Sequence, residues 1–347
     1  MRILVLGAAG HTGRFVVDDL VGRGLRVTAA GRHRGTDRLA TARATVPYES
    51  VTLPDPGRLA ELLAAADVVV NCAGPFADTA LDVVRAATRA GVAYLDVNAE
   101  QAVTRSIFEA FRDEPPTALV VPSVAFFGAL GDLVATAAAG DWSSVESAEI
   151  VIGLDSWHPT NGTRKTGARN SGRRLTFADG RLQPATDPRP AGSWDFGEPL
   201  GVLDVVETST ADQVTVSSHL ATTAVRVRMN ARPLADLSDP DTPAPALGPH
   251  GRSAQLFTVA ATVTRDGQQR SFAVSGHDIY AITAPIVGQA VELLAGHPRA
   301  GVHALAGLVD AEAFLRRLAP YGVQVRSPLA TAGTRSATCH RPQQGRP

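Results

Sequence analysis

The chain has 347 residues, of which 44% are hydrophobic and 19% charged, and its formal net charge at pH 7 is −1. A chain of this length usually forms more than one domain, and its charge provides no bulk attraction to nucleic acid or to an anionic membrane. No apolar run has the length of a membrane span, so we expect a cytoplasmic protein that binds neither. Its two cysteines and its histidines show no zinc-ligand spacing, and no metal site is predicted.

The first 140 residues alternate strand-like and helix-like patterns. Strands are predicted over residues 2–6, 26–30, 51–53, 68–72, 94–97 and 118–121. Between them, helices are predicted over residues 11–23, 55–66, 79–90 and 101–112. This alternation is typical of a parallel sheet with helices on both faces, and we therefore predict a doubly wound Rossmann domain over residues 1–140, in an α/β protein.

After residue 140 the pattern changes to consecutive strands. These are predicted over residues 147–154, 174–182, 202–208, 212–218, 224–230, 255–265 and 270–275. Asp-Gly turns at 178–181 and 265–268 favour hairpins, so we predict a second, α+β domain with an antiparallel sheet over residues 141–283. The segment 232–252, rich in Pro, Asp and Gly, is interpreted as a mobile loop or lid, and residues 327–347 as a disordered tail.

A glycine-rich turn lies between the first strand and the first helix. Gly7, Gly10 and Gly13 have the spacing GxxGxxG, a variant of the dinucleotide-binding fingerprint. Gly7 and Gly10 permit a tight turn and a close approach to a pyrophosphate, and Gly13 permits close packing of the helix. The amides of His11, Thr12 and Gly13 are then expected to face the phosphate at the positive end of the helix. The alternative is a glycine-rich turn that binds no ligand.

The end of the second strand distinguishes NADP from NAD. An NAD site usually has a carboxylate there for the ribose hydroxyl. Here the strand ends in Arg32, followed closely by Arg34, and no carboxylate is present. Guanidinium groups favour a 2′-phosphate, so we predict NADP(H), with solvated loop arginines as the alternative.

Two further loops are expected to pass the cofactor, at the ends of the fourth and fifth strands. A kinked Ala-Gly-Pro-Phe loop follows the fourth strand, and Asn98 follows the fifth. Asn71 is assigned either to the site or to a satisfied polar position in the core. The predicted cofactor contacts in these loops are Asn71, Ala73, Gly74, Pro75, Phe76 and Asn98.

Together the segments GAAGHTGR, VVNCAGPF, AGVAYLDV, VVPSVAFFGALGDL, PTNGT and GHDIYAITA resemble the saccharopine dehydrogenase-like family of NADP-binding oxidoreductases. This family includes saccharopine reductases and trans-acting enoyl reductases. The resemblance implies that the last helices, within residues 284–322, pack beside the Rossmann domain. It also implies a substrate cleft between the domains and a homodimer, with residues 141–283 forming the substrate and dimerisation domain. The segments 97–100 and 125–133 depart from the family pattern, which puts the substrate in doubt.

Catalysis by a Tyr-x-x-x-Lys pair is excluded, because Lys165 is the only lysine and Asn161 stands four residues before it. Neither HExxH nor GxSxG occurs. The remaining catalytic candidates are Lys165, Tyr280 and His158, each with a structural alternative as a solvated lysine, a core tyrosine or a packed histidine. We therefore predict an NADPH-dependent oxidoreductase that transfers a hydride to a C=N (imine) or polarised C=C (enoyl) bond of a small molecule. The alternative is a non-catalytic NADP-binding redox sensor.

Overall fold

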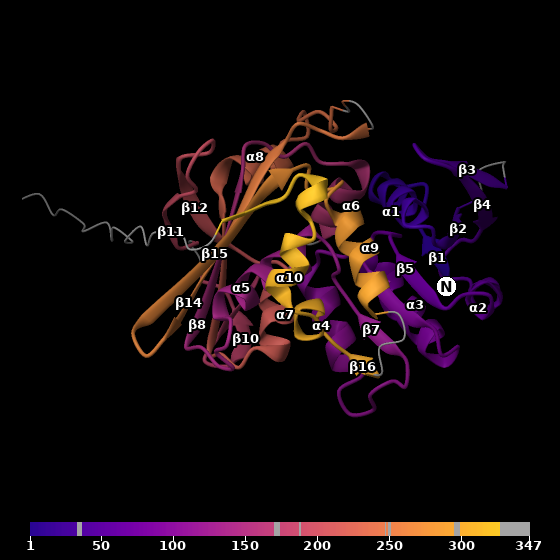
Figure 1. Cartoon of the computed structure of the whole chain (residues 1–347), viewed down its shortest axis with the longest axis horizontal. Coiled ribbons are helices and arrows are strands. Elements are labelled where there is room, and N and C mark those ends of the chain that lie inside the picture. The colour runs from indigo at the N-terminus through magenta and orange to yellow at the C-terminus, as the bar shows by residue number, and fades with distance from the viewer. Residues whose placement is uncertain are drawn as a thin grey trace, which may run out of the picture.

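Two large β-sheets organise the chain in the computed structural model, which describes residues 1–32, 37–169, 174–186, 189–246, 248, 251–294 and 299–326. Figure 1 shows the N-terminal sheet on the right, the second sheet on the left, and helices α9 (Thr283–Leu294) and α10 (Ala311–Arg316) in the middle of the view. The tail predicted over residues 327–347 lies outside the described residues.

The N-terminal sheet has the strand order β16-β7-β6-β5-β1-β2-β4-β3. Its strands are β1 (Arg2–Leu6), β2 (Arg26–Gly31), β3 (Arg38–Ala40), β4 (Thr45–Ser50), β5 (Val68–Asn71), β6 (Ala93–Asp96), β7 (Leu119–Val121) and β16 (Gly301–Val302). Its helices are α1 (His11–Gly22), α2 (Pro56–Ala64), α3 (Phe76–Arg89) and α4 (Gln101–Ala110). All its strand pairs are parallel except β3 with β4. This order is that of a doubly wound dinucleotide-binding sheet and confirms the predicted Rossmann domain.

Local sequence explains these elements well. Strands β1 and β5 are almost wholly buried, as expected for parallel strands covered by helices on both faces. Helix α3 buries Ala80, Val83, Val84 and Ala87, which share one face at helical spacing. It ends where Gly91 adopts a φ of 69°, a left-handed conformation that glycine takes without a steric penalty.

The second sheet contains nine strands, of which seven form the path β10-β9-β13-β8-β14-β15-β17. Its strands are β8 (Ser147–Leu154), β9 (Leu175–Ala178), β10 (Arg181–Pro184), β11 (Ala191–Asp195), β12 (Val202–Thr208), β13 (Ala224–Asn230), β14 (Leu256–Arg265), β15 (Gln268–His277) and β17 (Gln324–Arg326). β8 and β13 run parallel, whereas the other pairs among the described strands are antiparallel. The expectation of an antiparallel sheet therefore fails at this one central pair.

Both predicted Asp-Gly hairpins are present. β9 pairs with β10, and β14 pairs with β15 along ten residues of each strand. Asp179 and Gly180 have φ values of 52° and 72°, and Asp266 and Gly267 have 50° and 72°. Two successive positive φ values twist a two-residue turn in the sense that suits a hairpin, which is why Asp-Gly is a reliable signal.

The strand predicted over residues 212–218 is wrong, because this segment forms helix α7 (Asp212–His219). Alternating valines suggested a strand, but tertiary contacts outweigh that pattern. The Gln213 side chain accepts a hydrogen bond from the amide of Thr210 at 2.8 Å and donates one to the carbonyl of Thr208 at 2.9 Å. Thr215 donates to the carbonyl of Gly128 at 2.8 Å, so the polar face of the segment is satisfied only as a helix.

Three other segments also differ from expectation. The turn expected at Asn161 begins helix α6 (Asn161–Arg169), whose first turn is capped by the Thr160 hydroxyl, which accepts from the amide of Thr163 at 3.1 Å. Two glycines in α6 concealed it. The first part of the expected loop 232–252 forms helix α8 (Ala231–Ser238). The third strand is β4, before residues 51–53 rather than within them.

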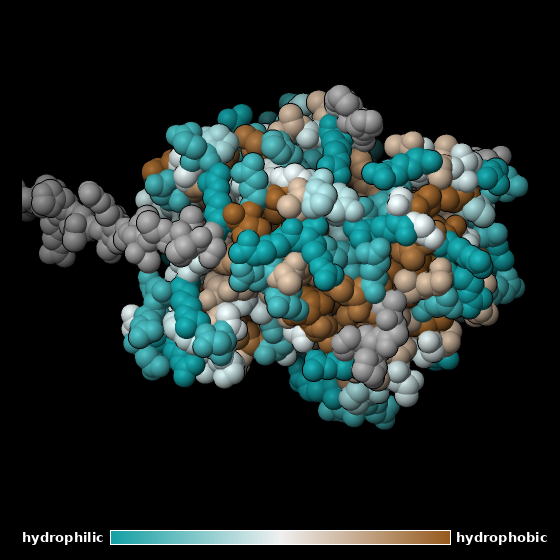
Figure 2. All heavy atoms as spheres, in the orientation of Figure 1, coloured by the Kyte–Doolittle hydropathy of each residue, from teal (hydrophilic) through white to brown (hydrophobic). Residues whose placement is uncertain are grey.

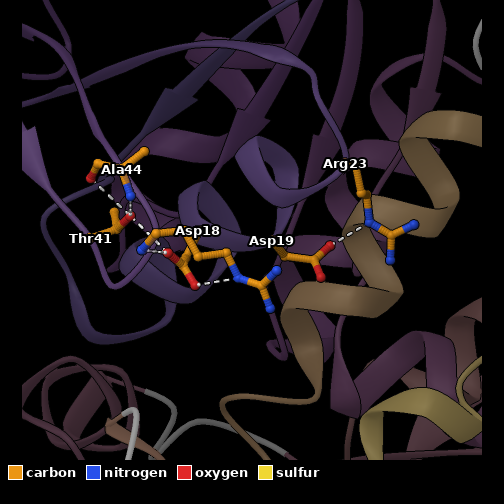
Figure 3. Close-up of polar contacts among 6 residues, drawn as sticks. Asp18, Asp19, Arg23, Thr41 and Ala44 are labelled. Carbon is orange, nitrogen blue, oxygen red and sulfur yellow. Dashed lines mark hydrogen bonds and ion pairs between the residues drawn. The ribbon is translucent and has the colours of Figure 1, made fainter.

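Helix α1 holds its neighbours through two adjacent carboxylates that point in opposite directions (Figure 3). Asp18 accepts hydrogen bonds from the Thr41 hydroxyl at 2.8 Å and from the amide of Arg43 at 2.6 Å, which ties the β3–β4 hairpin to the helix. Asp19 pairs with Arg23 at 2.6 Å on the other side. Arg23 also pairs with Glu292 of α9 at 2.6 Å, so α9 lies directly against α1.

The remaining helices and the surface complete the fold. Helix α5 (Gly131–Ala139) packs against β14 and β15 and also against α10. No helix among the described residues combines the length and apolarity needed to cross a bilayer. Figure 2 shows hydrophilic side chains over most of one face, with hydrophobic residues gathered mainly near its middle.

The packing of α9 on α1 leads to a test at Gly288. A Cβ atom there would overlap the Asp19 carboxylate and the Arg23 guanidinium. We expect Gly288→Ala to lower the free energy of unfolding by about 1–3 kcal/mol, the usual effect of overpacking. The matched control is Gly57→Ala in α2, where a Cβ would meet only Asp55 at 3.8 Å, and which should be neutral or stabilising. Urea denaturation followed by circular dichroism measures both, and equal stability of the two variants would contradict the packing described.

Candidate functional site

The turn between β1 and α1 is shaped by missing side chains. Gly7 has a φ of 70°, and a Cβ on it would come within 2.6 Å of the backbone of Cys72 and Ala73. A Cβ on Gly13 would overlap the carbonyl oxygen of Gly7. Gly10 differs, since a Cβ there would meet only that same carbonyl, at 3.1 Å. Two of the three glycines therefore serve close backbone packing, and Gly10 leaves open space beside the turn.

Open space beside Gly10 adjoins the N-terminus of α1. Gly10 is the N-cap residue of this helix, and no side chain caps the helix by a hydrogen bond. The first turn contains no acidic residue. His11, Thr12 and Gly13 all line the cavity that opens here. Uncapped amides at the positive end of a helix form a binding site for an anionic group, so this part of the structure fits the pyrophosphate of a dinucleotide.

The sequence predicts a ligand contact for the backbone amide of His11 but none for its imidazole ring. Its ring packs edge-to-face on Phe15 and on Tyr280, with ring centroids 5.3 and 5.2 Å apart. Burial lowers the pKa of His11, against a smaller opposing effect of Asp278, so the ring is neutral at pH 7. Its Nε2 atom is buried and has no hydrogen-bond partner in the described structure. A neutral ring with an unsatisfied nitrogen on a cavity wall is suited to a polar contact with a ligand.

Arg32 stands at the end of β2 and lines the same cavity. Its backbone is fixed by Tyr48, whose hydroxyl donates to the carbonyl oxygen of Arg32 at 2.8 Å. The side chain itself is exposed. Arg34, the second predicted phosphate ligand, lies outside the described residues.

The loop after β5 forms the next part of the wall, through Ala73, Gly74, Pro75 and Phe76. Thr79 donates a hydrogen bond to the carbonyl of Ala73 at 2.8 Å. The amide of Phe76 donates to the carboxylate of Glu100 at 3.1 Å. These contacts hold the loop from behind, so the four predicted contact residues face the cavity on a fixed backbone.

Asn71 and Asn98 were predicted as cofactor contacts, but neither side chain lines the cavity. Both are fully buried beneath the loops that do. Asn71 accepts from the amide of Ala73 at 3.0 Å, and Asn98 accepts from the amide of Glu100 at 3.0 Å. The side-chain amides of Asn71 and Asn98 hold the loops that form the cavity wall, and they do not reach the cavity itself.

A buried carboxylate organises this lower layer. Asp96 accepts four hydrogen bonds, from the amides of Asn98 and Ser123, the side-chain amide of Asn98 and the Tyr94 hydroxyl, at 2.6 to 3.0 Å. Burial raises the pKa of Asp96 even though these donors oppose the shift. Burial raises the pKa of Glu100 in the same way. The ends of β5, β6 and β7 are thus joined by one polar network under the cavity floor.

The cavity extends from the glycine turn to the second sheet and has a volume of about 1470 Å³. Sites for a single small molecule usually have about 300–1,000 Å³. Beyond the NADP-binding domain it is lined by α8 and by residues at the ends of β12 and β13. Helix α6 also lines it and borders the loop after β5, since a Cβ on Gly74 would lie 4.0 Å from the Thr166 hydroxyl. One continuous space can therefore hold a dinucleotide together with a second molecule.

The three catalytic candidates are placed differently. Lys165 and Tyr280 line the cavity, whereas His158 does not, and its ring lies 3.3 Å from the carbonyl of Pro243. The Tyr280 hydroxyl accepts from the indole of Trp157 at 3.0 Å and lies 2.9 Å from the Thr163 hydroxyl. Burial raises the pKa of Tyr280, so the phenol remains protonated. Lys165 makes no ion pair or hydrogen bond with any residue that the structure describes.

Several cavity residues were not found from the sequence. Trp157, Arg174 and Arg189 line the far side, as do Leu234 and Leu237 of α8. None of them lies in a recognisable motif, and only the folding of distant segments around one space brings them together. The described residues contain no group of three His, Cys, Asp or Glu side chains that could hold a metal ion.

The strand order and the uncapped glycine turn define the class of protein, a Rossmann dinucleotide-binding protein. Residues 3–119 match the family described as "Saccharopine dehydrogenase NADP binding domain". This part of the chain is therefore similar to the NADP-binding domain of that family, which confirms the predicted resemblance and the predicted cofactor. A comparison with curated protein sequences gives no match.

Solved structures extend the likeness to nearly the whole chain. Apo saccharopine dehydrogenase (L-Glu forming) from Saccharomyces cerevisiae matches with a TM-score of 0.61 and 13% identity, covering 94% of this chain and 100% of that one. The C. glutamicum DAP dehydrogenase in complex with DAP has a TM-score of 0.47 and 12% identity, covering 92% and 98%. At 13% identity the first of these shows a likeness of fold alone, and it spans nearly the whole of both chains.

We expect Gly10→Val to abolish NADP(H) binding while the protein stays folded. Gly10 has a φ of −67°, which any residue can adopt, but a branched side chain would fill the space beside the helix amides. Calorimetric titration with NADPH measures the loss, and Gly57→Val, at an exposed helix position, is the control. Retention of wild-type affinity would show that the phosphate does not bind at this turn.

We expect Arg32→Asp to weaken NADPH binding by roughly ten- to a hundredfold and to leave NADH binding much less changed, because charge-assisted bonds to the 2′-phosphate are lost. Arg26→Asp, at the opposite end of β2, is the matched control. The ratio of the two dissociation constants is the measurement. An equal loss for both cofactors would place Arg32 away from the 2′-phosphate.

Proposed function

We propose that the protein is an NADP(H)-dependent oxidoreductase that transfers a hydride between the cofactor and a C=N or polarised C=C bond of a small molecule. The observation that carries this proposal is the single cavity of about 1470 Å³, which joins the glycine turn of the NADP-binding domain to a wall built by a second sheet. A protein that only sensed the cofactor would need no such second compartment.

The residues of this chain would divide the work between binding and orientation. The α1 amides hold the phosphates, and the loop from Ala73 to Phe76 supports the cofactor along the edge of the sheet. NADPH, when bound, supplies the hydride. Helices α6 and α8 line the part of the cavity that would hold the second molecule. Bringing the reacting atoms together in a defined geometry provides a large part of the acceleration in such reactions.

Lys165 is our first candidate for the group that donates a proton or a hydrogen bond to the developing negative charge. Its ammonium lies on the cavity wall without a partner among the described residues, so it is available to a substrate. The Tyr280 hydroxyl accepts from the indole of Trp157 and from the amide of Thr160, and it shares a hydrogen bond with the Thr163 hydroxyl. We assign Tyr280 mainly to positioning α6, since it contacts Thr163 in the first turn of that helix and Thr160 directly before it.

Turnover tests the proposal directly. Purified protein is mixed with NADPH and a panel of imines and of α,β-unsaturated carbonyl compounds, and the absorbance of the reduced cofactor is followed. We expect oxidation of NADPH with at least one of the two classes. Tight binding of NADPH without turnover across a wide panel would instead support a non-catalytic redox sensor.

We expect Lys165→Met to lower kcat by roughly a hundredfold or more, in the range of general acid catalysis, with little change in the dissociation constant of NADPH. Tyr280→Phe should change KM more than kcat if it only positions α6. Arg181→Met, on an exposed hairpin strand, is the control for the loss of a surface cation. Wild-type turnover in Lys165→Met would remove this residue from the reaction.

A further inference from the structure

The far half of the cavity has an unbalanced set of charges. Three cationic residues line it from α6 and the segments around β9 to β11, namely Lys165, Arg174 and Arg189. Among all cavity-lining residues that the structure describes, Asp78 is the only carboxylate, and it belongs to α3 in the NADP-binding domain. Among the described residues, the part of the wall outside the NADP-binding domain thus carries cations and no carboxylate.

Three carboxylates close to this wall already accept hydrogen bonds within the protein. One is Glu100, which accepts from the amide of Phe76 and from the Thr166 hydroxyl of α6. Asp278 accepts from the amides of Ser253, Tyr280 and Ala281 at 2.7 to 3.0 Å, and it is buried away from the cavity. Asp236 accepts from the amide of Trp157 at 2.9 Å. None of these three side chains lines the cavity. A ligand ammonium group placed here would be desolvated without a counter-ion among the described lining residues, which is unfavourable.

Lys165 is the cation best suited to meet a ligand anion. It has no hydrogen-bond or ion-pair partner among the described residues, whereas Arg174 and Arg189 each interact within the protein as well. Lys165 points from α6, whose first turn is fixed by the contacts of Thr160 and Thr163 with Tyr280. The Lys165 side chain therefore extends from a helix whose first turn is fixed by hydrogen bonds.

The same half of the cavity has a broad apolar wall. Phe127 lies 5.0 Å from Phe126 and stacks on Trp157 at 5.4 Å, measured between ring centroids. Leu234 and Leu237 of α8, three residues apart on one helical face, also line the cavity. Met229 at the end of β13 completes this wall. A hydrocarbon chain of several methylene groups would find apolar partners here.

Contacts between α6 and α8 hold this wall in place. Arg164 of α6 donates to the carbonyl of Asp239, directly after α8, at 3.1 Å, and also to the carbonyl of Thr242. The bond from the amide of Trp157 to Asp236 joins the aromatic part to α8. The cationic and the apolar parts of the wall are thus connected in one preformed arrangement, which lowers the cost of ordering on binding.

We propose that the substrate half of the cavity binds an amphipathic organic anion, with an apolar chain and an acidic head group but without an ammonium group. The head group would be held by Lys165 and the chain by the wall of Phe127, Trp157 and α8. This inference rests on the proposed function, in which the same cavity holds NADP(H) beside the substrate. We therefore expect zwitterionic α-amino acids to bind less tightly than such an anion.

Calorimetric titrations of the full chain, with and without saturating NADP⁺, test the proposal with four eight-carbon probes: octanoate, octyl phosphate, 2-aminooctanoate and octan-1-ol. We expect at least one of the two anions to bind roughly tenfold or more tightly than the amino acid or the alcohol. The tighter anion identifies the head group as carboxylate or phosphate. Equal or tighter binding of 2-aminooctanoate or octan-1-ol would overturn the proposal.

The only lysine of the chain provides a second, site-resolved readout. Acetylation with an N-hydroxysuccinimide ester can modify only Lys165 and the N-terminal amine, and peptide mass spectrometry separates the two. We expect octanoate or octyl phosphate to slow acetylation of Lys165 severalfold and to leave that of the N-terminus unchanged. Lack of protection by an anion that binds calorimetrically would place its head group elsewhere and overturn the assignment to Lys165.

Two variants separate the charge from the apolar wall. Lys165→Glu should weaken binding of the preferred anion at least tenfold, with Arg181→Glu as its control. Leu237→Ser should reduce the preference for octanoate over butyrate severalfold, since fewer methylene groups are buried, with exposed Leu293→Ser as its control. Unchanged binding in both cavity variants would overturn the proposal. The NADP⁺ titration is independent of these results, so loss of cofactor binding or of turnover in the wild type would count against the proposed function alone.

Discussion

The close approach of two backbones at the edge of the first sheet is the constraint on which the site depends. Gly7 leaves no room for a Cβ against Cys72 and Ala73, and Gly13 leaves none against the carbonyl of Gly7. Because these side chains are missing, the β1–α1 turn and the loop after β5 can lie against each other and open one cavity between them. Gly10, with free space beside it, then leaves the helix amides accessible to an anion.

This crowded edge is supported from below by polar groups that never reach the cavity. Asp96 accepts four hydrogen bonds from three residues, Tyr94, Asn98 and Ser123, and Glu100 fixes the amide of Phe76. Burying carboxylates in this way is unfavourable unless they are hydrogen-bonded, and here each bond positions a loop of the wall. The loops that line the NADP-binding part of the cavity are thus held by a buried polar layer. Two of its residues, Asn71 and Asn98, were predicted from the sequence as cofactor contacts but support these loops instead.

The second sheet contributes a different chemistry to the same space. Its helices α6 and α8 bring cations and apolar side chains, while nearby carboxylates such as Asp278 are occupied with backbone amides. Helix α9 is joined to α1 of the NADP-binding domain by Arg23, which forms ion pairs with Asp19 of α1 and with Glu292 of α9. The NADP-binding domain and the second sheet therefore contribute chemically different walls to one cavity.

The amino-acid sequence by itself indicated the alternating strands and helices of a Rossmann domain, the Asp-Gly hairpins, the glycine turn and the preference for NADP, because each leaves a pattern among residues near one another in the chain. Only the tertiary structure decided that residues 212–218 and 161–169 are helices, since their hydrogen bonds come from Thr208, Gly128 and Tyr280, far away in sequence or on other elements. It also separated Asn71 and Asn98 from the cavity and gathered Trp157, Lys165 and Leu237 around it. Contacts between distant segments leave no local pattern in the sequence, so it could not predict which residues α6 and α8 contribute to the cavity.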